Sequence, residues 1–296
     1  MFTRIDHVMI CVPDLQRGME QYRRIGFNVH AGGSHPGKGT HNAIALNKDD
    51  YVELLAIRDA AEQQAASRGG GSWGPNLADF IAAGGGIRYV IIQSDDLAAD
   101  VAAMRGRGVD VGDAVEGSRR TTGGQTLRWK AAVLGPDNPL PIFFIQHLTP
   151  MSERRKQAHG DGGHPNGVYS IERAYIVTRD VNAEAAIYAK VLGMPAPVPH
   201  KGTVIMADMA VFQIGPNGLG IVQPYAPGPA ADALERRGPG PFQALYRTTS
   251  MGAAARWMQE QGMPPLARGT RNTGEQAMLV TPADACGAYI GFVGPE

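Results

Sequence analysis

The sequence predicts an α+β protein of four βαβββ modules, paired into two domains that each form a curved mixed β-sheet around a cleft, with the helices outside. Three observations support this prediction. The chain has 296 residues, about twice the length of a typical domain. Its 39 glycines and 21 prolines follow no period, which favours many short elements joined by tight turns. One pattern of strand, turn, helix and glycine occurs four times, which indicates an internal repeat.

Each copy of the pattern begins with an apolar strand, passes through an acidic or polar turn into an amphipathic helix, and ends at a glycine. The first copy has its strand at 5–11, its turn at Asp14, apolar residues at helical spacing from Leu15, and Gly26, the residue type that commonly ends helices. In the first, second and fourth copies, the first apolar helix residue and the glycine are eleven positions apart. The strands of the other copies are expected at 87–92, 171–177 and 242–246.

Short apolar or alternating runs bounded by turn residues follow each glycine and complete the βαβββ unit. Such a unit cannot bury both faces of its sheet alone, so two units should pair around a shared cleft. These additional strands are expected at 42–46, 51–57, 126–134 and 141–148 in the first half, and at 204–214, 220–224, 277–280 and 288–293 in the second.

A polar, glycine-rich stretch separates the two halves. Residues 151–169 contain SERRKQAHGDGGHPNG, a composition typical of linkers. We therefore expect a first domain with the candidate active site at residues 1–150, a linker at 151–169, and a second domain at 170–296.

Charge and composition restrict the possible partners. The 28 basic and 28 acidic residues cancel, which argues against nucleic acid or an anionic membrane surface as a partner. No apolar run approaches the roughly 18 residues of a membrane span, and the N-terminus has the pattern of a strand rather than of a secretory signal. Cys11 and Cys286 lie near opposite ends of the chain in apolar runs, which favours buried thiols over a disulfide. We expect a cytoplasmic protein that binds a small-molecule substrate; a homodimer is compatible with the sequence.

The repeated pattern resembles the vicinal-oxygen-chelate superfamily, in which two βαβββ modules close a sheet around a metal or ligand. Over residues 1 to about 175 the chain is similar to the glyoxalase-like domain group of bacterial proteins. The segments that carry this similarity are IDHVMICVPDL, HPGKGTHNAIAL, DDYVELLAI, LRWKAA, PIFFIQ and HPNGVYSIER. The remaining part resembles the superfamily only through the repeat, in the two-domain layout of extradiol dioxygenases.

The resemblance implies a divalent metal ion, Zn, Mn, Fe or Ni, held by inward-facing side chains from the first and last strands of each paired module. In the first module these residues are His7 and Glu53, whose imidazole and carboxylate suit such ions. Registering the second module on the first places Tyr89 opposite His7 and Gln146 opposite Glu53. Gln146 would be a carbonyl-oxygen ligand, whereas Tyr89 would be an unusual ligand and would instead be a proton donor or a phenol that faces the bound molecule. Glu53 alternates with apolar neighbours and should face the cleft, where a buried carboxylate is a ligand or a general base.

Five further residues are candidates for binding the substrate. Thr40, His41 and Asn42 follow a glycine-rich turn and would hold an oxyanion or carboxylate, although a polar hairpin edge explains them as well. In the alternating strand around Arg128 and Trp129, one side chain should face the cleft; Arg128 would clamp a carboxylate, and Trp129 is equally compatible with the core. The other histidines are expected on the surface or in the linker; they include His147, His164 and His200.

The second half lacks a comparable set, because the same register returns Arg173, Gln223, Gln243 and Gly291. We expect a degenerate copy that shapes the first cleft, dimerises or binds a ligand. For the whole protein, a metal-dependent lyase, isomerase or hydrolase that stabilises an enediolate of a small oxygenated metabolite is preferred. An extradiol-type ring-cleaving dioxygenase and a non-catalytic protein that sequesters a small molecule are the alternatives. Metal content separates the two enzymes from the binding protein, and oxygen consumption with catechols separates the two enzymes.

Overall fold

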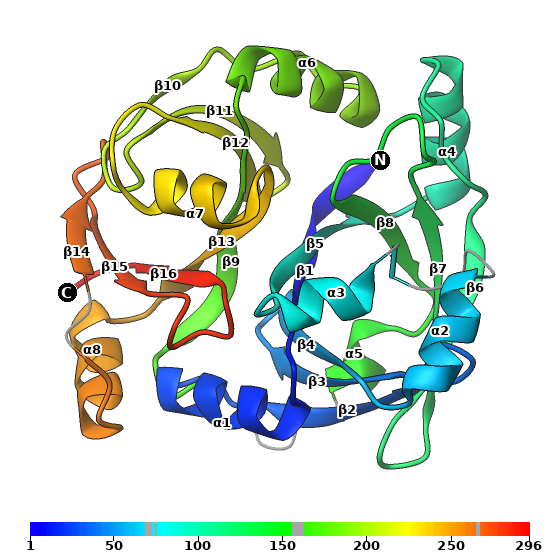
Figure 1. Cartoon of the computed structure of the whole chain (residues 1–296), viewed down its shortest axis with the longest axis horizontal. Helices are drawn as coiled ribbons and strands as arrows, with labels where there is room; N and C mark the ends of the chain where they lie inside the picture. Colours follow the sequence, from blue (N-terminus) through cyan, green and yellow to red (C-terminus); the bar gives the residue numbers. More distant parts are fainter. Residues whose placement is uncertain (69–72, 75, 156–162, 265–266) are drawn as a thin grey trace.

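The computed structural model describes residues 1–68, 73–74, 76–155, 163–264 and 267–296, whose strands form two sheets (Figure 1). Within these residues, the first sheet closes into a barrel and the second stays open. In spatial order the barrel contains β1 (Phe2–Cys11), β4 (Tyr51–Ile57), β3 (Thr40–Leu46), β2 (His30–His35), β6 (Val115–Arg120), β7 (Thr126–Val133), β8 (Ile142–His147) and β5 (Gly86–Ser94). In spatial order the second sheet contains β10 (His200–Gly202), β11 (Ala207–Ile214), β12 (Asn217–Pro224), β9 (Val168–Val177), β13 (Gly240–Thr248), β16 (Tyr289–Val293), β15 (Gln276–Val280) and β14 (Ala267–Thr270).

The predicted α+β class, with four βαβββ modules in two domains, is confirmed. In the first module β1 pairs in parallel with β4, and in the second β5 pairs in parallel with β8. The first strands of these two modules, β1 and β5, are antiparallel neighbours. The second sheet repeats this arrangement, with β9 parallel to β12, β13 parallel to β16, and β9 antiparallel to β13.

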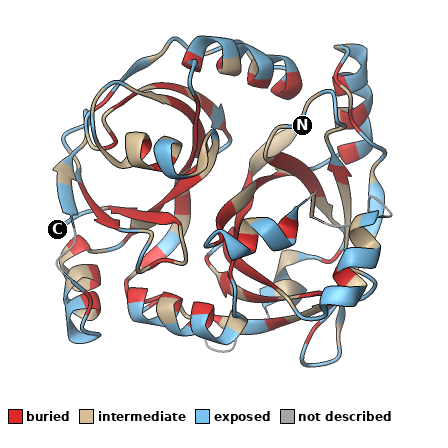
Figure 2. Ribbon diagram, viewed as in Figure 1, coloured by how far each residue is buried: buried red, intermediate tan, exposed pale blue. Residues whose placement is uncertain are grey.

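One helix of each module begins directly after the predicted turn residue, which is Asp14 in the first module. These helices are α1 (Leu15–Ile25), α4 (Leu97–Gly106), α6 (Val181–Leu192) and α8 (Met251–Glu260). Each has an N-cap side chain that accepts a hydrogen bond from a backbone N–H of the first turn, which satisfies donors that the helix itself leaves free. Figure 2 shows that these helices are buried on one side and exposed on the other, as their apolar stripes require.

Helices between the modules were not predicted from the sequence. α2 (Ala60–Arg68) and α3 (Leu77–Ala82) follow the first module, α5 (Met151–Arg155) follows the second, and α7 (Pro229–Arg237) follows the third. In Figure 1, α3 and α7 lie across the openings of the two sheets. Ala230 and Ala233 of α7 join a buried cluster on the second sheet together with Phe242 and Tyr289, so this helix fills the concave face of the second sheet. Leu77 and Ile81 of α3 cover only part of the barrel interior.

The last residues of the predicted linker pack between the two sheets. His164 is buried and accepts a hydrogen bond at Nδ1 from the backbone N–H of Asn28, 3.0 Å away, while its Nε2 lies 2.8 Å from Oδ1 of Asn47. His164 thus lies in the predicted linker, as one of the two expectations had it, but it is buried and not on the surface. Residues 156–162 of the linker lie outside the described residues. Among the described helices, we find none with the length and apolar character that spanning a bilayer requires.

Candidate functional site

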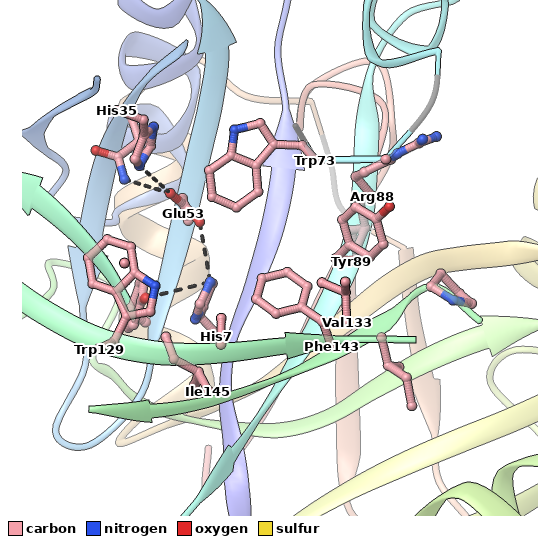
Figure 3. A pocket seen from close by; sticks show the side chains of 18 of the residues that line it. His7, His35, Glu53, Trp73, Arg88, Tyr89, Trp129, Val133, Phe143 and Ile145 are labelled. Atoms are coloured by element: carbon pink, nitrogen blue, oxygen red, sulfur yellow. Dashed lines mark hydrogen bonds and ion pairs between the residues drawn. The ribbon is translucent and has the colours of Figure 1, made fainter. Parts of the chain in front are cut away.

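The barrel encloses a cavity of about 1360 Å³ that extends from His7 to the second domain. In Figure 3, His7, His35 and Glu53 lie on one side of this cavity, and Tyr89, Phe143 and Val133 lie toward the other. The cavity therefore combines a polar site with an apolar wall, which is the usual character of a small-molecule site.

His7 and Glu53 face each other inside the barrel. They come from β1 and β4, neighbouring parallel strands in which Glu53 pairs with Met9, two residues after His7. Nε2 of His7 lies 3.2 Å from Oε2 of Glu53. The imidazole also stacks on the Tyr51 ring, with ring centroids 4.1 Å apart. The sequence-predicted pair is thus brought together, with both side chains buried.

Asp6 joins this pair because β1 carries an irregularity at this point. The register between β1 and β5 shifts between Ile5 and His7, and such a bulge re-aims side chains next to functional sites. Oδ2 of Asp6 lies 2.7 Å from Nδ1 of His7, and Oδ1 lies 2.9 Å from Nε2 of His147. A chain of ionisable groups therefore runs from Glu53 through His7 and Asp6 to His147.

The electrostatic environment favours the charged forms of His7 and Glu53 within this chain of ionisable groups. Burial alone would lower the pKa of His7, but hydrogen bonds to Asp6 and Glu53 outweigh burial and raise it. Burial alone would raise the pKa of Glu53, but the hydrogen bond and charge of His7, helped by His35 and Asn42, lower it to about 2. Asp6 is likewise held well below its usual pKa because His147 and His7 outweigh its burial. The pKa of His7 is therefore shifted toward the imidazolium form, between two carboxyl groups whose pKa values are lowered.

The glycine-rich hairpin supports Glu53 from the other side. Nδ2 of Asn42 donates to Oε1 of Glu53 at 2.5 Å, and Nε2 of His35 lies 4.0 Å from the same oxygen. Burial lowers the pKa of His35 to about 4, so this imidazole is neutral. Thr40 Oγ1 lies 3.0 Å from Nδ1 of His35 and accepts a hydrogen bond from Nε1 of Trp73 at 3.0 Å. Thr40 therefore positions two cavity side chains.

Only some of the predicted substrate-binding residues line the cavity. Asn42, Arg128 and Trp129 do, whereas His41 points to the other side of β3 and lies outside the cavity lining. Of the Arg128 and Trp129 pair, Trp129 is the one that faces inward. The guanidinium of Arg128 lies 2.5 Å from Glu116 at the border of the cavity, and 58 % of its side chain is exposed. Because side chains alternate along a strand, Trp129 facing inward forces Arg128 outward.

The register places Phe143, not Gln146, opposite Glu53. Ile91 holds the position in β5 that Met9 holds in β1, and Ile91 pairs with Phe143 just as Met9 pairs with Glu53. Gln146 comes three residues later and therefore points to the opposite face. Its Oε1 accepts from the backbone N–H of Leu97 at 3.2 Å, at the start of α4. Gln146 is a capping residue, and the predicted role as a metal ligand is wrong.

The same correction applies to the second domain. Tyr175 holds the corresponding position in β9 and pairs with Gly220, so Gly220 replaces the predicted Gln223. Oε1 of Gln223 accepts from the backbone N–H of Val181 at 3.1 Å, at the start of α6. The other three positions are Arg173, Gln243 and Gly291, as predicted from the repeat.

The four positions implied to hold a metal thus carry His7, Glu53, Tyr89 and Phe143. Phe143 has no donor atom, and burial raises the pKa of Tyr89, which disfavours the phenolate that a metal would require. Among the described residues, no three His, Cys, Asp or Glu side chains are grouped so as to hold a metal ion. This donor set does not fit the closed divalent site that the resemblance implies.

Several residues in or next to the cavity were missed by sequence reasoning. Asp6 was overlooked because a strand pattern does not reveal a bulge. His147 was expected on the surface, yet only 14 % of its side chain is exposed, and it contacts Asp6. Arg119 and Arg154 also line the cavity. The alternation of Arg119 with exposed Ser118 and Arg120 in β6 was a signal that could have identified it.

Comparisons with known proteins agree with this fold. The model of a family described as a glyoxalase-like domain matches residues 5–192. A search of curated proteins found no match. A hypothetical protein from Staphylococcus aureus superposes with a TM-score of 0.68 at 15% identity, covering 97% of this chain and 98% of that one. A mutant of 4-hydroxymandelate synthase from Streptomyces coelicolor gives a TM-score of 0.67 at 13% identity, covering 100% of this chain and 94% of that one. At these identities the two likenesses concern the fold.

Proposed function

Because this chain belongs to the glyoxalase-like domain family, we propose that its barrel is the active site of an isomerase or lyase that moves a proton on a small oxygenated metabolite. One observation carries the proposal. His7 lies between two buried carboxylates, 2.7 Å from Asp6 and 3.2 Å from Glu53, at the wall of a large cavity. Groups with strongly shifted pKa values that meet in a cavity are typical of acid–base sites.

In the proposed reaction, Glu53 accepts a proton from the carbon next to a substrate carbonyl. The imidazolium of His7 donates a hydrogen bond to the carbonyl oxygen and stabilises the negative charge of the enediolate that forms. Asp6 holds Nδ1 of His7 protonated and fixes the ring. In an isomerisation, Glu53 returns the proton to the former carbonyl carbon, and the hydroxyl proton passes through His7 to the other oxygen. In an elimination, the leaving group departs with its bonding electron pair, the enolate electrons form the new double bond, and Glu53 releases its proton to water.

Substrate binding explains how a carboxyl group with a pKa of about 2 becomes a base. His7 provides the largest interaction that holds this pKa down. When a substrate oxygen takes the N–H of His7, Glu53 loses that partner while it stays buried, and burial then raises its pKa. A general base works best when its pKa lies near the working pH. No step is assigned to a metal ion, because the donor set does not fit one.

Deuterium exchange tests the proposal. Wild-type protein and His7→Gln would be incubated in D₂O with 2-oxo acids, 2-hydroxy aldehydes and hydroxy ketones, and carbon-bound deuterium would be followed by NMR. The expected result is enzyme-dependent exchange for at least one class, lost in His7→Gln and retained in His200→Gln, whose residue is exposed on β10. Absence of exchange across the whole panel contradicts the proposal.

A non-catalytic binding protein is the second candidate. Two of the four positions that the resemblance implies for a metal carry the aromatic residues Tyr89 and Phe143, whose ring centroids are 5.6 Å apart. These rings favour a planar or apolar ligand. Tight binding of such a ligand without exchange would support this alternative. Oxygen consumption with catechols would instead support the ring-cleaving reaction.

A further inference from the structure

Two arginines lie in the cavity without a close carboxylate partner. Arg119 comes from β6 and Arg154 from α5, and 9 % of the Arg154 side chain is exposed. Among the described residues, the side chain of Arg119 has neither a hydrogen bond nor a carboxylate within 4 Å. Arg154 approaches only Asp6, at 4.0 Å, and the oxygen it approaches is already 2.9 Å from His147.

The two guanidinium groups repel each other. The pKa of Arg119 is lowered, first by burial and further by the charge of Arg154, while Tyr51 and Glu53 act in the opposite direction. Holding two cations together away from water is unfavourable unless an anion accompanies them. A carboxylate between two guanidinium groups would form short, charge-assisted hydrogen bonds.

Such an anion would lie next to the proposed acid–base pair. The guanidinium carbon of Arg154 lies 5.7 Å from the centroid of the Tyr51 ring, and the other neighbour of that ring is the stacked imidazole of His7, 4.1 Å away between centroids. A carboxylate bound by the arginines therefore brings the adjoining carbons of the same molecule toward His7 and Glu53.

The opposite part of the cavity has an apolar wall, although the charged residues Arg88, Glu184 and Arg237 also belong to the lining. Its lining passes Phe143 and Val133 and reaches Pro241 and Phe242 at the beginning of β13, in the second domain. Phe143 and Val133 lie on the side of the cavity away from Glu53 in Figure 3. A volume of about 1360 Å³ exceeds what a three- or four-carbon metabolite would fill. The space suits an apolar chain or ring attached to the acid.

We propose that the substrate is a carboxylic acid with an apolar tail, whose carboxylate binds between Arg119 and Arg154 and whose tail extends toward residues 240–242 of the second domain. This inference rests on the proposed function in that it concerns the same cavity. It also gives the second domain a role, because that domain supplies the end of the tail site.

Isothermal titration calorimetry of the full chain with acetate, butyrate, hexanoate, octanoate and neutral octanamide tests binding without requiring turnover. Affinity should rise about 3- to 4-fold for each methylene that becomes buried, and octanoate should bind at least about 10-fold more tightly than octanamide. Arg119→Gln and Arg154→Gln should weaken octanoate binding by about 10- to 100-fold and leave octanamide unchanged. Arg120→Gln and Arg155→Gln are matched controls, since both residues are exposed neighbours on the same elements, and should bind octanoate like wild type.

The charge-retaining variant Arg119→Lys should recover part of the octanoate affinity that Arg119→Gln loses. Such a recovery would show that the loss in Arg119→Gln does not come from misfolding. Equal binding of octanoate and octanamide, or full octanoate binding by both glutamine variants, overturns the inference. Octanoate binding without proton exchange on any acid would overturn the proposed function alone. Proton exchange on an uncharged substrate only, unaffected by Arg119→Gln, would overturn the inference alone.

Discussion

Phe143 occupies, in the second module of the barrel, the position that Glu53 occupies in the first. Both residues pair with the equivalent position of the neighbouring parallel strand, Ile91 for Phe143 and Met9 for Glu53. The barrel is therefore symmetric in its backbone and asymmetric in its chemistry. One half carries the ionisable groups, and the other half carries an aromatic wall.

This asymmetry predicts that restoring the missing donors creates a metal site. The double variant Tyr89→His/Phe143→Glu should gain stability on addition of Zn²⁺ or Mn²⁺, because binding to the folded state alone raises the Tm. The wild-type Tm should change by less than about 1 °C under the same conditions. Differential scanning calorimetry with and without EDTA measures both. Stoichiometric metal in wild type purified without chelators, lost in His7→Ala, would contradict the account.

Asp6 should control the protonation of His7. In Asp6→Asn the imidazole of His7 loses the carboxylate nearest to it, so the pKa of His7 should fall. The raised pKa of His7 contributes stability that is present below about pH 6.5 and is lost as pH rises through the folded value. The variant should therefore lose stability mainly at acidic pH. NMR titration of the imidazole Cε1 proton provides the measurement. An unchanged His7 titration in Asp6→Asn would contradict the control of His7 by Asp6.

Asp50 lies at the contact between the domains and should make the free energy of unfolding depend on pH. Burial raises its pKa to about 7, although Asn47 and the backbone N–H of Ile171 act in the opposite direction. The folded state therefore binds this proton more tightly than the unfolded chain, and stability falls as pH rises from about 4 to about 7. Asp50→Asn should remove this fall.

Urea denaturation at pH 5 and pH 8 measures the effect. The unfolding free energy of Asp50→Asn minus that of wild type should be about 1–3 kcal/mol larger at pH 8 than at pH 5. Asp49→Asn, at the half-buried neighbouring position, keeps Asp50 and should therefore keep the pH dependence of wild type. Parallel pH curves for wild type and Asp50→Asn would show that the carboxyl group is not buried as described.

Gln146 and Gln223 should contribute to stability through the helices that they cap. Gln146→Ala and Gln223→Ala each leave a backbone N–H at the start of α4 or α6 without its acceptor. Each variant should lose about 0.5–2 kcal/mol of unfolding free energy. Chemical denaturation measures this loss, and Gln16→Ala, on the exposed face of α1, should change little. Stability equal to wild type in both variants would exclude the capping role.

The sequence was sufficient to predict the four modules and the two site residues of the first module, His7 and Glu53. Strands and helices follow from local periodicity and from turn residues such as Asp14 and Gly26, which act within a few residues. His7 and Glu53 could be paired because both lie in strongly alternating segments. The helices between modules were missed because α3 is short and its apolar residues gain their burial from the barrel interior.

The errors at the site concern contacts between strands. The identity of the residue opposite Glu53 depends on which residue of β8 pairs with Ile91, and a shift of three positions exchanges Phe143 for Gln146 and one face for the other. Asp6 reaches His7 and His147 beside a bulge formed with β5, which a single strand does not encode. His147, at the end of β8, and Arg154, on α5, join the site because the folded chain brings both side chains to Asp6 of β1.

The most direct test is exchange of the C3 proton of 2-oxohexanoate with D₂O, followed by NMR in the presence of EDTA. Wild type and Glu20→Gln, altered at an exposed site on α1, should incorporate deuterium at the same rate. Glu53→Gln should be slower by a factor of about 100 or more, because a positioned general base contributes on that order. Equal rates in wild type and Glu53→Gln, or no exchange by the wild type, would contradict the assignment of Glu53 and His7 as the proton-transfer pair.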